Sequence, residues 1–160
     1  MITYRIATES PDYPADDTSG TGARLSGGRW NSKGNAVIYT SSSRALAAME
    51  VLVHLATPGL PLNRYLVEFQ IPDALWKKRE VASVRQLVGW DAQPHGITSV
   101  TCGDEWLTQG RTLILEVPSV IVPEEANILN NPGHHDMKKV IATKDRKWTF
   151  DPRLGNVGGA

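Results

Sequence analysis

The stretch that decides the fold is residues 27–54, which reads GGRWNSKGNAVIYTSSSRALAAMEVLVH. Two glycines precede Arg29, a β-branched run contains Tyr39, and an apolar segment carries Glu50. Glycine permits positive φ and lets the backbone approach a ligand closely. An arginine, a tyrosine and a glutamate within about one strand and two helix turns are hard to explain by packing alone. This stretch therefore predicts a small-molecule site, which we expect to be enzymatic.

The end of this stretch, residues 44–56, is predicted to be a helix with Ser42 or Ser43 as its N-cap. At about 100° per residue, one broad apolar face is expected to hold six residues: Ala45, Leu46, Met49, Leu52, Val53 and Ala56. Glu50 borders this face, and His54 lies one turn further on. Because an unpartnered buried carboxylate is costly, Glu50 is expected to line a polar cleft. The alternative is an exposed helix glutamate.

Working outward, alternation and β-branched content predict strands at residues 2–7, 37–40, 64–71, 112–117, 127–129 and 147–150. Residues 9–22 are a loop by composition, and residues 131–133 a turn. We expect Pro58, Gly59 and Pro61 to stop the helix, and residues 156–160 to form a frayed tail. Short helices or turns are predicted at 72–76, 82–90 and 103–107, and extended chain at 120–122. These elements indicate one α+β domain over residues 1–160, a mixed β core with flanking short helices.

The composition limits the classes of function. The 160 residues suit one domain with one core, and 17 basic residues balance 17 acidic ones. Neutral charge gives no electrostatic reason to expect direct nucleic acid binding or a membrane surface as partner. The single cysteine excludes an internal disulfide and fits a reducing compartment. No apolar run approaches the roughly 20 residues of a membrane span, and no signal pattern opens the chain. We expect a cytoplasmic protein.

Each candidate residue also has a structural alternative. The forked donors of Arg29 suit a phosphate or a carboxylate, but a surface arginine paired with a nearby acid has the same appearance. Tyr39 is expected either to stack on a flat heterocycle or to be a half-buried core tyrosine. Ser119 follows a strand and a proline, where its hydroxyl would face a pocket or cap a turn.

Metal and nucleotide motifs find little support. His134, His135 and Asp136 together with His54 would offer ligands, but neither HExxH nor paired Cys/His spacing is present. We therefore expect no metal site. A Walker loop and a Gly-x-Gly-x-x-Gly turn are both absent from the sequence.

Seven motifs in order resemble the RES-domain family. They are YRI at 4–6, GGRWNSKG at 27–34, VIYTSS at 37–42, ALAAMEVLVH at 45–54, VPS at 117–119, NILNNPGHHD at 127–136 and FDPRL at 150–154. The family is named for an arginine, a glutamate and a serine, matched here by Arg29, Glu50 and Ser119. The likeness covers nearly the whole chain. His135 stands where a proline would be expected, which affects the local turn alone.

The resemblance implies a toxin of a bacterial type II toxin–antitoxin pair, with a cognate Xre-type helix-turn-helix antitoxin and a possible homodimer within the complex. It also implies a fold like that of ADP-ribosyltransferases and an enzyme that consumes NAD+. Arg29, Tyr39 and Glu50 would then be catalytic, and Ser119, Arg5 and Arg24 would help to bind substrate. NAD+ is in this case a consumed substrate, so no cofactor is expected.

The chemistry of these residues agrees with that implication. Cleavage of the nicotinamide–ribose bond passes through an oxocarbenium-like state, which a carboxylate at Glu50 would stabilise. Hydrolysis or phosphorolysis of NAD+ and ADP-ribosylation of a protein need the same donor site, so the sequence leaves them open. A non-catalytic binding module of the same fold and a metal hydrolase are the remaining alternatives.

Overall fold

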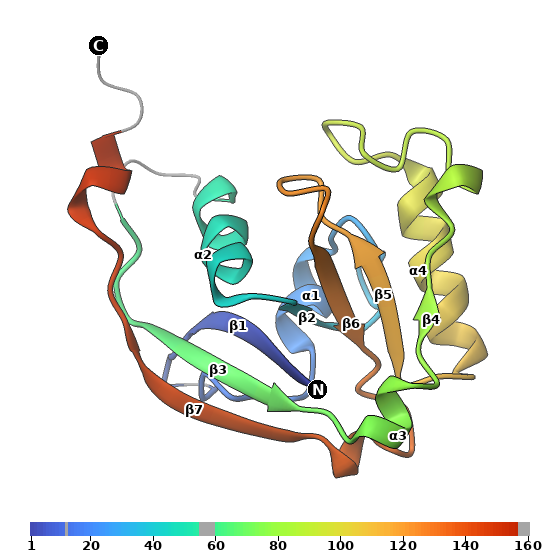
Figure 1. Ribbon diagram of the computed structural model, residues 1–160, viewed down its shortest axis with the longest axis horizontal. Helices are drawn as coiled ribbons and strands as arrows, with labels where there is room; N and C mark the ends of the chain where they lie inside the picture. The colour runs from blue at the N-terminus through green and yellow to red at the C-terminus, as the bar shows by residue number, and fades with distance from the viewer. Residues whose placement is uncertain (12, 55–59, 157–160) are drawn as a thin grey trace.

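The structure is a computed structural model, which describes residues 1–11, 13–54 and 60–156 (Figure 1). Seven strands form one sheet in the order β4-β5-β6-β2-β1-β3-β7. The strands are β1 Ile2–Thr8, β2 Ile38–Ser41, β3 Arg64–Gln70, β4 Glu80–Val81, β5 Ile114–Pro118, β6 Ala126–Asn130 and β7 Ile141–Trp148. The helices are α1 Thr21–Ser26, α2 Arg44–Val53, α3 Asp73–Trp76 and α4 Ile97–Gln109, with 3₁₀ turns at Val84–Gln86, Met137–Lys139 and Pro152–Asn156.

The sheet is divided at the junction between β1 and β2. Along β1 and β3 seven residue pairs are in register, from Ile2↔Gln70 to Thr8↔Arg64. Between β1 and β2 the single register pair is Tyr4↔Ser41. The β1-β3-β7 half and the β5-β6-β2 half therefore diverge from this point, and α2 lies near the junction in Figure 1. A division of this kind leaves room for side chains from both halves to face the same space.

Strand alternation distributes the apolar side chains over three clusters. One joins both halves of the sheet and includes Ile38, Phe69 and Ile128. A second packs the other face of β2, β5 and β6 against α4 through Trp30, Trp106 and Leu129. The third lies under α2: Ile6, Ala47, Leu66 and Phe150. The expectation of a single α+β domain with a mixed sheet and short helices is confirmed.

The predicted strands are present, with shifted ends. The strand predicted at 147–150 instead runs from Ile141 to Trp148, and the short helix or turn predicted at 103–107 is part of the much longer α4, which ends at Gln109 with Gly110 as its C-cap. Within 82–90 the structure has only a 3₁₀ turn, preceded by β4. The extended chain predicted at 120–122 is wrong, because those residues form bends. The expected helix stop at 58–59 and residues 157–160 of the expected tail lie outside the described residues, whereas Asn156 belongs to the 3₁₀ turn Pro152–Asn156.

The predicted buried face of α2 is only partly right, because Leu46 is buried as expected but Ala45, Met49 and Val53 are exposed. Leu46 and Ala47 are buried, whereas Met49 and Val53 are 41% and 54% exposed. The helix packs on β1 and β3 through Ala47, whose small side chain permits close approach. Its buried side is therefore rotated toward Ala47 and away from the larger Met49, and this rotation turns Glu50 toward the sheet. Of the two predicted N-caps, Ser43 is the one whose side chain accepts from Leu46 N.

None of the helices among the described residues combines the length and the apolar character that crossing a membrane requires.

Candidate functional site

Glu50 is held by two neutral hydrogen-bond donors. The Nδ2 of Asn127 donates to Glu50 Oε1 over 2.5 Å, and Ser119 Oγ donates to the same oxygen over 3.3 Å. The donors come from β6 and from the segment that follows β5. Within the described residues no cationic group lies within 4 Å of this carboxylate. The charge of Glu50 is thus oriented without being neutralised by an ion pair.

Ser119 is completely buried beneath this carboxylate. Its Oγ accepts hydrogen bonds from Ile121 N over 3.0 Å and Val122 N over 3.2 Å. Because a hydroxyl has two acceptor lone pairs and one proton, these contacts direct the proton of Ser119 toward Glu50. The same two contacts bend the chain at 120–122, which explains why the apolar run there is not extended.

Tyr39 lies on the same face of the sheet as the partners of Glu50. In the β2–β6 ladder Tyr39 pairs with Leu129, and Ser41 pairs with Asn127. Residues two apart on a strand point to the same face and lie roughly 7 Å from each other. The phenol of Tyr39 and the amide that holds Glu50 are therefore neighbours along one face.

The Tyr39 hydroxyl is fixed and uncharged. It donates to Asn31 Oδ1 over 2.8 Å and accepts from Trp30 N over 3.1 Å. Burial raises the pKa of Tyr39 well above its ordinary value, which keeps the phenol neutral. A Cβ added to Gly28 would lie 2.9 Å from this hydroxyl, so the glycine is needed for the close approach.

Arg29 is anchored at one end of its guanidinium. Its Nη1 donates to the carbonyls of Trp90 (2.7 Å) and Ala92 (3.0 Å). The ring of Trp90 in turn stacks on that of Trp30, with 6.3 Å between centroids. No hydrogen bond to a described residue uses Nη2 or Nε. Through Nη1, Arg29 therefore holds the segment around Trp90 next to residues 29–30. Its Nη2 and Nε donors remain available for a ligand.

Arg29, Tyr39 and Glu50 lie within each other's electrostatic field. Burial lowers the pKa of Arg29, and the negative charge of Glu50 raises it in part. The pKa of Tyr39, raised mainly by burial, is lowered slightly by Arg29 and raised by Glu50. Charges influence one another in this way only at short range. The three predicted residues thus share one electrostatic environment, although no hydrogen bond or ion pair joins them to one another.

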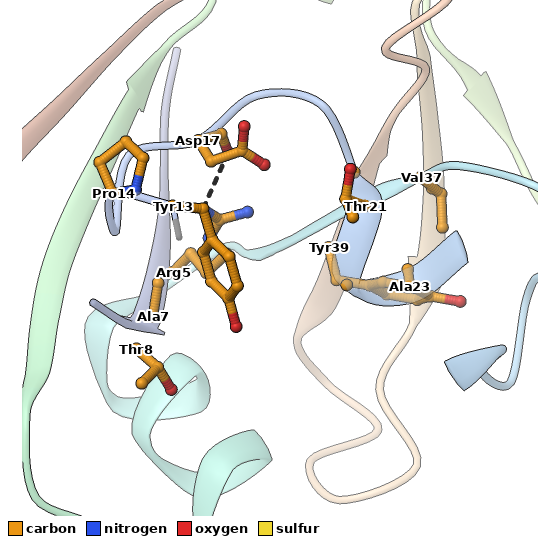
Figure 2. Close-up of a pocket in the computed structure, with 12 residues that line it drawn as sticks. Arg5, Ala7, Thr8, Tyr13, Pro14, Asp17, Thr21, Ala23, Val37 and Tyr39 are labelled. Atoms are coloured by element: carbon orange, nitrogen blue, oxygen red, sulfur yellow. Dashed lines mark hydrogen bonds between the residues drawn. The ribbon is translucent and has the colours of Figure 1, made fainter. Parts of the chain in front are cut away.

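A cavity of about 230 Å³ adjoins this site between β1 and β2 (Figure 2). Tyr39 lines it together with Val37, Thr21, Tyr13 and Arg5. Arg29, Glu50 and Ser119 are not among its lining residues. Of the three residues predicted to be catalytic, Tyr39 is thus the one that lines the cavity.

The two further arginines lie in different surroundings. Arg5 donates from Nη2 to the carbonyls of Ala15 (2.6 Å) and Asp17 (3.0 Å), and burial lowers its pKa (Figure 2). It secures the loop that covers the cavity while lining the cavity itself. Arg24 is exposed on α1 and does not line this cavity.

The histidine cluster forms a separate, self-contained turn. Ligand atoms of His134, His135 and Asp136 lie within 4.8 Å of one another. However, Nδ1 of His134 accepts the Asp136 N–H over 3.1 Å, and Lys139 Nζ lies 2.7 Å from Asp136 Oδ1. His134 Nδ1 and Asp136 Oδ1 are therefore already engaged within the turn. His54, considered with this group as a further ligand, contacts the Glu50 carbonyl at the end of α2.

The sequence reasoning missed the residues that support the site. Asn127, Ser41 and Asn31 lie within the quoted motifs but were given no role, and neither Trp90 nor Ala92 was expected to hold Arg29. One signal in the sequence was available for Asn127. Strand alternation puts this polar residue on the same face of β6 as the buried Leu129, where a polar side chain needs a partner.

Comparison with known proteins supports the resemblance stated above. The sequence model of the RES domain matches residues 2–152. The chain belongs to the RES domain family. Its relatives include the Prs ADP-ribosylating toxin of Sphingobium sp. (strain YBL2), 55% identical over 94% of both chains. The Toxin Res proteins of Yersinia enterocolitica and Photorhabdus laumondii are each 35% identical, over 96% of this chain and 99% and 97% of theirs.

A solved structure shares the fold of this RES domain. A chain in the crystal structure of the M. tuberculosis MbcT–MbcA toxin–antitoxin complex superimposes with a TM-score of 0.60. The likeness covers 97% of this chain and 86% of that one, with 16% sequence identity. At this identity the likeness shows the fold alone.

Proposed function

We propose that this RES domain is the toxin of a toxin–antitoxin pair and that it cleaves the nicotinamide–ribose bond of NAD+, depleting the dinucleotide and arresting growth. The observation that carries the proposal is the carboxylate of Glu50, held by neutral donors beside Tyr39 and Arg29. Relatives named as toxins at 35–55% identity support it. Such an enzyme would act in the cytoplasm.

The chemistry requires an anion whose charge is still available. As nicotinamide departs, positive charge develops on the ribose ring, as it does in glycoside cleavage. A preoriented carboxylate stabilises this charge more in the transition state than in the ground state, and so accelerates the reaction. Glu50 is suited to this role because Asn127 and Ser119 orient it without an ion pair.

The other residues would bind and orient the dinucleotide. The rigid, neutral ring of Tyr39 would stack on nicotinamide, and the free donors of Arg29 would contact the pyrophosphate. The burial of Ser119 and its contact with Glu50 favour a positioning role over direct substrate contact. Arg5 would contribute positive potential to the cavity, and Arg24 an outer phosphate contact. NAD+ is here a substrate, so the reaction needs no further cofactor.

An antitoxin would be the protein partner. A chain of the MbcT–MbcA toxin–antitoxin complex shares this fold, which supports such a partner. We extend this to an Xre-type helix-turn-helix antitoxin and to a toxin homodimer within the complex. Because the toxin has a net charge of zero, contact with DNA would belong to the antitoxin.

Protein ADP-ribosylation is the second candidate, because the relative at 55% identity is named a Prs ADP-ribosylating toxin. Both reactions begin with the same bond cleavage and differ in the nucleophile that attacks the ribose. A third reading, a binding module without catalysis, predicts that Glu50→Ala leaves growth inhibition unchanged.

One experiment separates these candidates. Purified protein is incubated with NAD+ alone, with phosphate, and with Prs as acceptor, and nicotinamide and modified protein are measured. Nicotinamide release without an acceptor supports hydrolysis, phosphate-dependent release supports phosphorolysis, and release only with a labelled acceptor supports the transferase. An intact dinucleotide under all three conditions, with antitoxin absent, would refute an NAD+-consuming enzyme.

A further inference from the structure

We infer that Asn127 is a positioning residue for Glu50, and that Ser41 fixes the direction in which the Asn127 amide points. This inference rests on the proposed function, since it assigns to Asn127 the geometry of the carboxylate that would stabilise the transition state. It concerns two residues outside the arginine, glutamate and serine for which the family is named.

The three side chains form one hydrogen-bonded relay. Ser41 Oγ donates to Asn127 Oδ1 over 2.9 Å, and Asn127 Nδ2 donates to Glu50 Oε1 over 2.5 Å. Ser41 is nearly inaccessible, at 4% exposure, and is the register partner of Asn127 across β2 and β6. The relay is thus built on two paired strands, which hold side chains more rigidly than loops do.

The direction of the amide follows from both contacts. If the amide were reversed, Oδ1 of Asn127 would face the Glu50 carboxylate, and two acceptors would oppose each other. In the observed direction each acceptor faces a donor. Because the Glu50 carboxylate only accepts, it draws the N–H side of the amide, and the Ser41 hydroxyl donates to the remaining Oδ1 and holds the amide in that orientation.

The relay leaves the second oxygen of the carboxylate available. Asn127 and Ser119 both donate to Oε1, and no hydrogen bond to a described residue involves Oε2. One oxygen is thereby fixed by the protein while the other is left for a ribose hydroxyl or the developing charge. Since both donors are neutral, they position the Glu50 carboxylate without neutralising its negative charge.

The variant Asn127→Asp tests this relay with almost no change in shape. Aspartate retains the acceptor for Ser41 and the volume of the side chain, but it replaces the N–H donor with an oxygen that repels Glu50. We expect kcat for nicotinamide release to fall about 100-fold, because small displacements of a catalytic group have effects of this size. KM should stay within about threefold, since substrate contacts are unchanged.

A control and a second variant keep the test decisive. Asn63→Asp makes the same exchange at an exposed residue whose amide contacts the Glu9 carbonyl, and it should leave kcat unchanged. Ser41→Ala removes only the orienting donor, and we expect about a tenfold fall in kcat with KM unchanged. Melting temperatures identify variants that fail to fold, and in that case Ser41→Ala decides alone.

The outcomes distinguish this inference from the proposed function. If Glu50→Gln retains wild-type turnover, the proposed function is wrong whatever Asn127 does. If Glu50→Gln is inactive while folded Asn127→Asp turns over at the wild-type rate, only the relay is wrong. A loss in both relay variants that appears in KM rather than kcat would likewise overturn the positioning role.

Discussion

The carboxylates of Glu50 and Asp136 are held by different kinds of neighbour: neutral donors contact Glu50, whereas a lysine contacts Asp136. Asp136 lies 2.7 Å from Lys139 Nζ and 3.2 Å from His135 Nε2, and the hydrogen bond from Lys139 is the main cause of its lowered pKa. Glu50 receives hydrogen bonds from a neutral amide and a neutral hydroxyl. A cation holds a carboxylate by neutralising it, whereas neutral donors hold it and leave its charge to act on something else.

Most other acidic contacts in the described residues follow the pattern of Asp136. Glu9, Glu68, Glu80 and Glu116 each form an ion pair with a lysine or an arginine. Glu125 is closer to Glu50, since it accepts from Ser43 Oγ over 2.5 Å. Ser43 is the N-cap of α2, the helix that carries Glu50, so the contact with Glu125 helps to fix the start of that helix. Asp104 also accepts only from neutral groups, Ser32 N and Asn35 Nδ2, so what distinguishes Glu50 is the combination of neutral donors with its place near Tyr39 and Arg29.

The largest expected effect on the rate comes from replacing the carboxylate of Glu50, with the same exchange at Asp136 as the control. Glu50→Gln should lower the rate of nicotinamide release by roughly 10²–10³, the usual loss when a group that stabilises transition-state charge is removed. The matched exchange Asp136→Asn should leave the rate within about twofold, because Asp136 is already neutralised by its own turn. Both rates come from nicotinamide release at saturating NAD+. Equal losses in the two variants would remove the distinction between the sites.

Ser119→Ala should have an intermediate effect on turnover and a clear effect on stability. It removes one donor to Glu50, which should lower turnover about tenfold. It also leaves Ile121 N and Val122 N without their acceptor, at a cost of about 1–3 kcal/mol for each group that stays buried. Denaturant titration and initial rates measure the two effects.

The control for this prediction is Ser99→Ala. Ser99 is also completely buried, but its only hydrogen bond among the described residues is the long 3.4 Å contact to the Gly96 carbonyl. We expect a smaller loss of stability and unchanged turnover. A fall in turnover as large as that of Ser119→Ala would mean that loss of rate merely follows loss of stability.

The smallest effect concerns the pH dependence of stability at the Asp136 turn. The folded-state pKa of Asp136 lies below its ordinary value of 3.8, mainly because of Lys139. Its contribution is therefore present above the ordinary pKa and is lost as pH falls through the lowered folded pKa. Lys139→Met should be slightly less stable than the wild type at pH 6, and the two should converge in strong acid. Thermal unfolding across this range, with activity at pH 6 unchanged, tests the prediction.

Patterns along the chain predicted the elements that carry Tyr39 and Glu50, but not the residues that contact these two side chains. Alternation placed Tyr39 on a strand, and helical periodicity placed Glu50 beside a buried face. Which side of α2 is buried depends on how closely Ala47 approaches β1 and β3. Helical periodicity gives no information about this approach. The relay partner Asn127 becomes meaningful only through its register with Ser41.

Helix α4 shows the same limit from the other side. A short helix or turn was predicted only from residue 103, whereas α4 begins at Ile97 and holds Gly103 in its interior, where glycine is unfavourable. In the structure a Cβ at Gly103 would lie 1.9 Å from the Trp30 carbonyl, so a tertiary contact requires the glycine. Sequence patterns report the local conformational preference of each residue. At Gly103 the close approach of the Trp30 backbone outweighs that preference.

The stacked rings of Trp30 and Trp90 give this protein a built-in optical reporter. Trp30 is nearly inaccessible, and its partner belongs to the segment that Arg29 fastens to the site. Any ligand that draws the guanidinium away from those carbonyls would change the spacing of two indoles, and with it their emission and their near-ultraviolet dichroism. Replacing Trp76, Trp106 and Trp148 with phenylalanine one at a time would assign the signal, so that binding could be followed without a label.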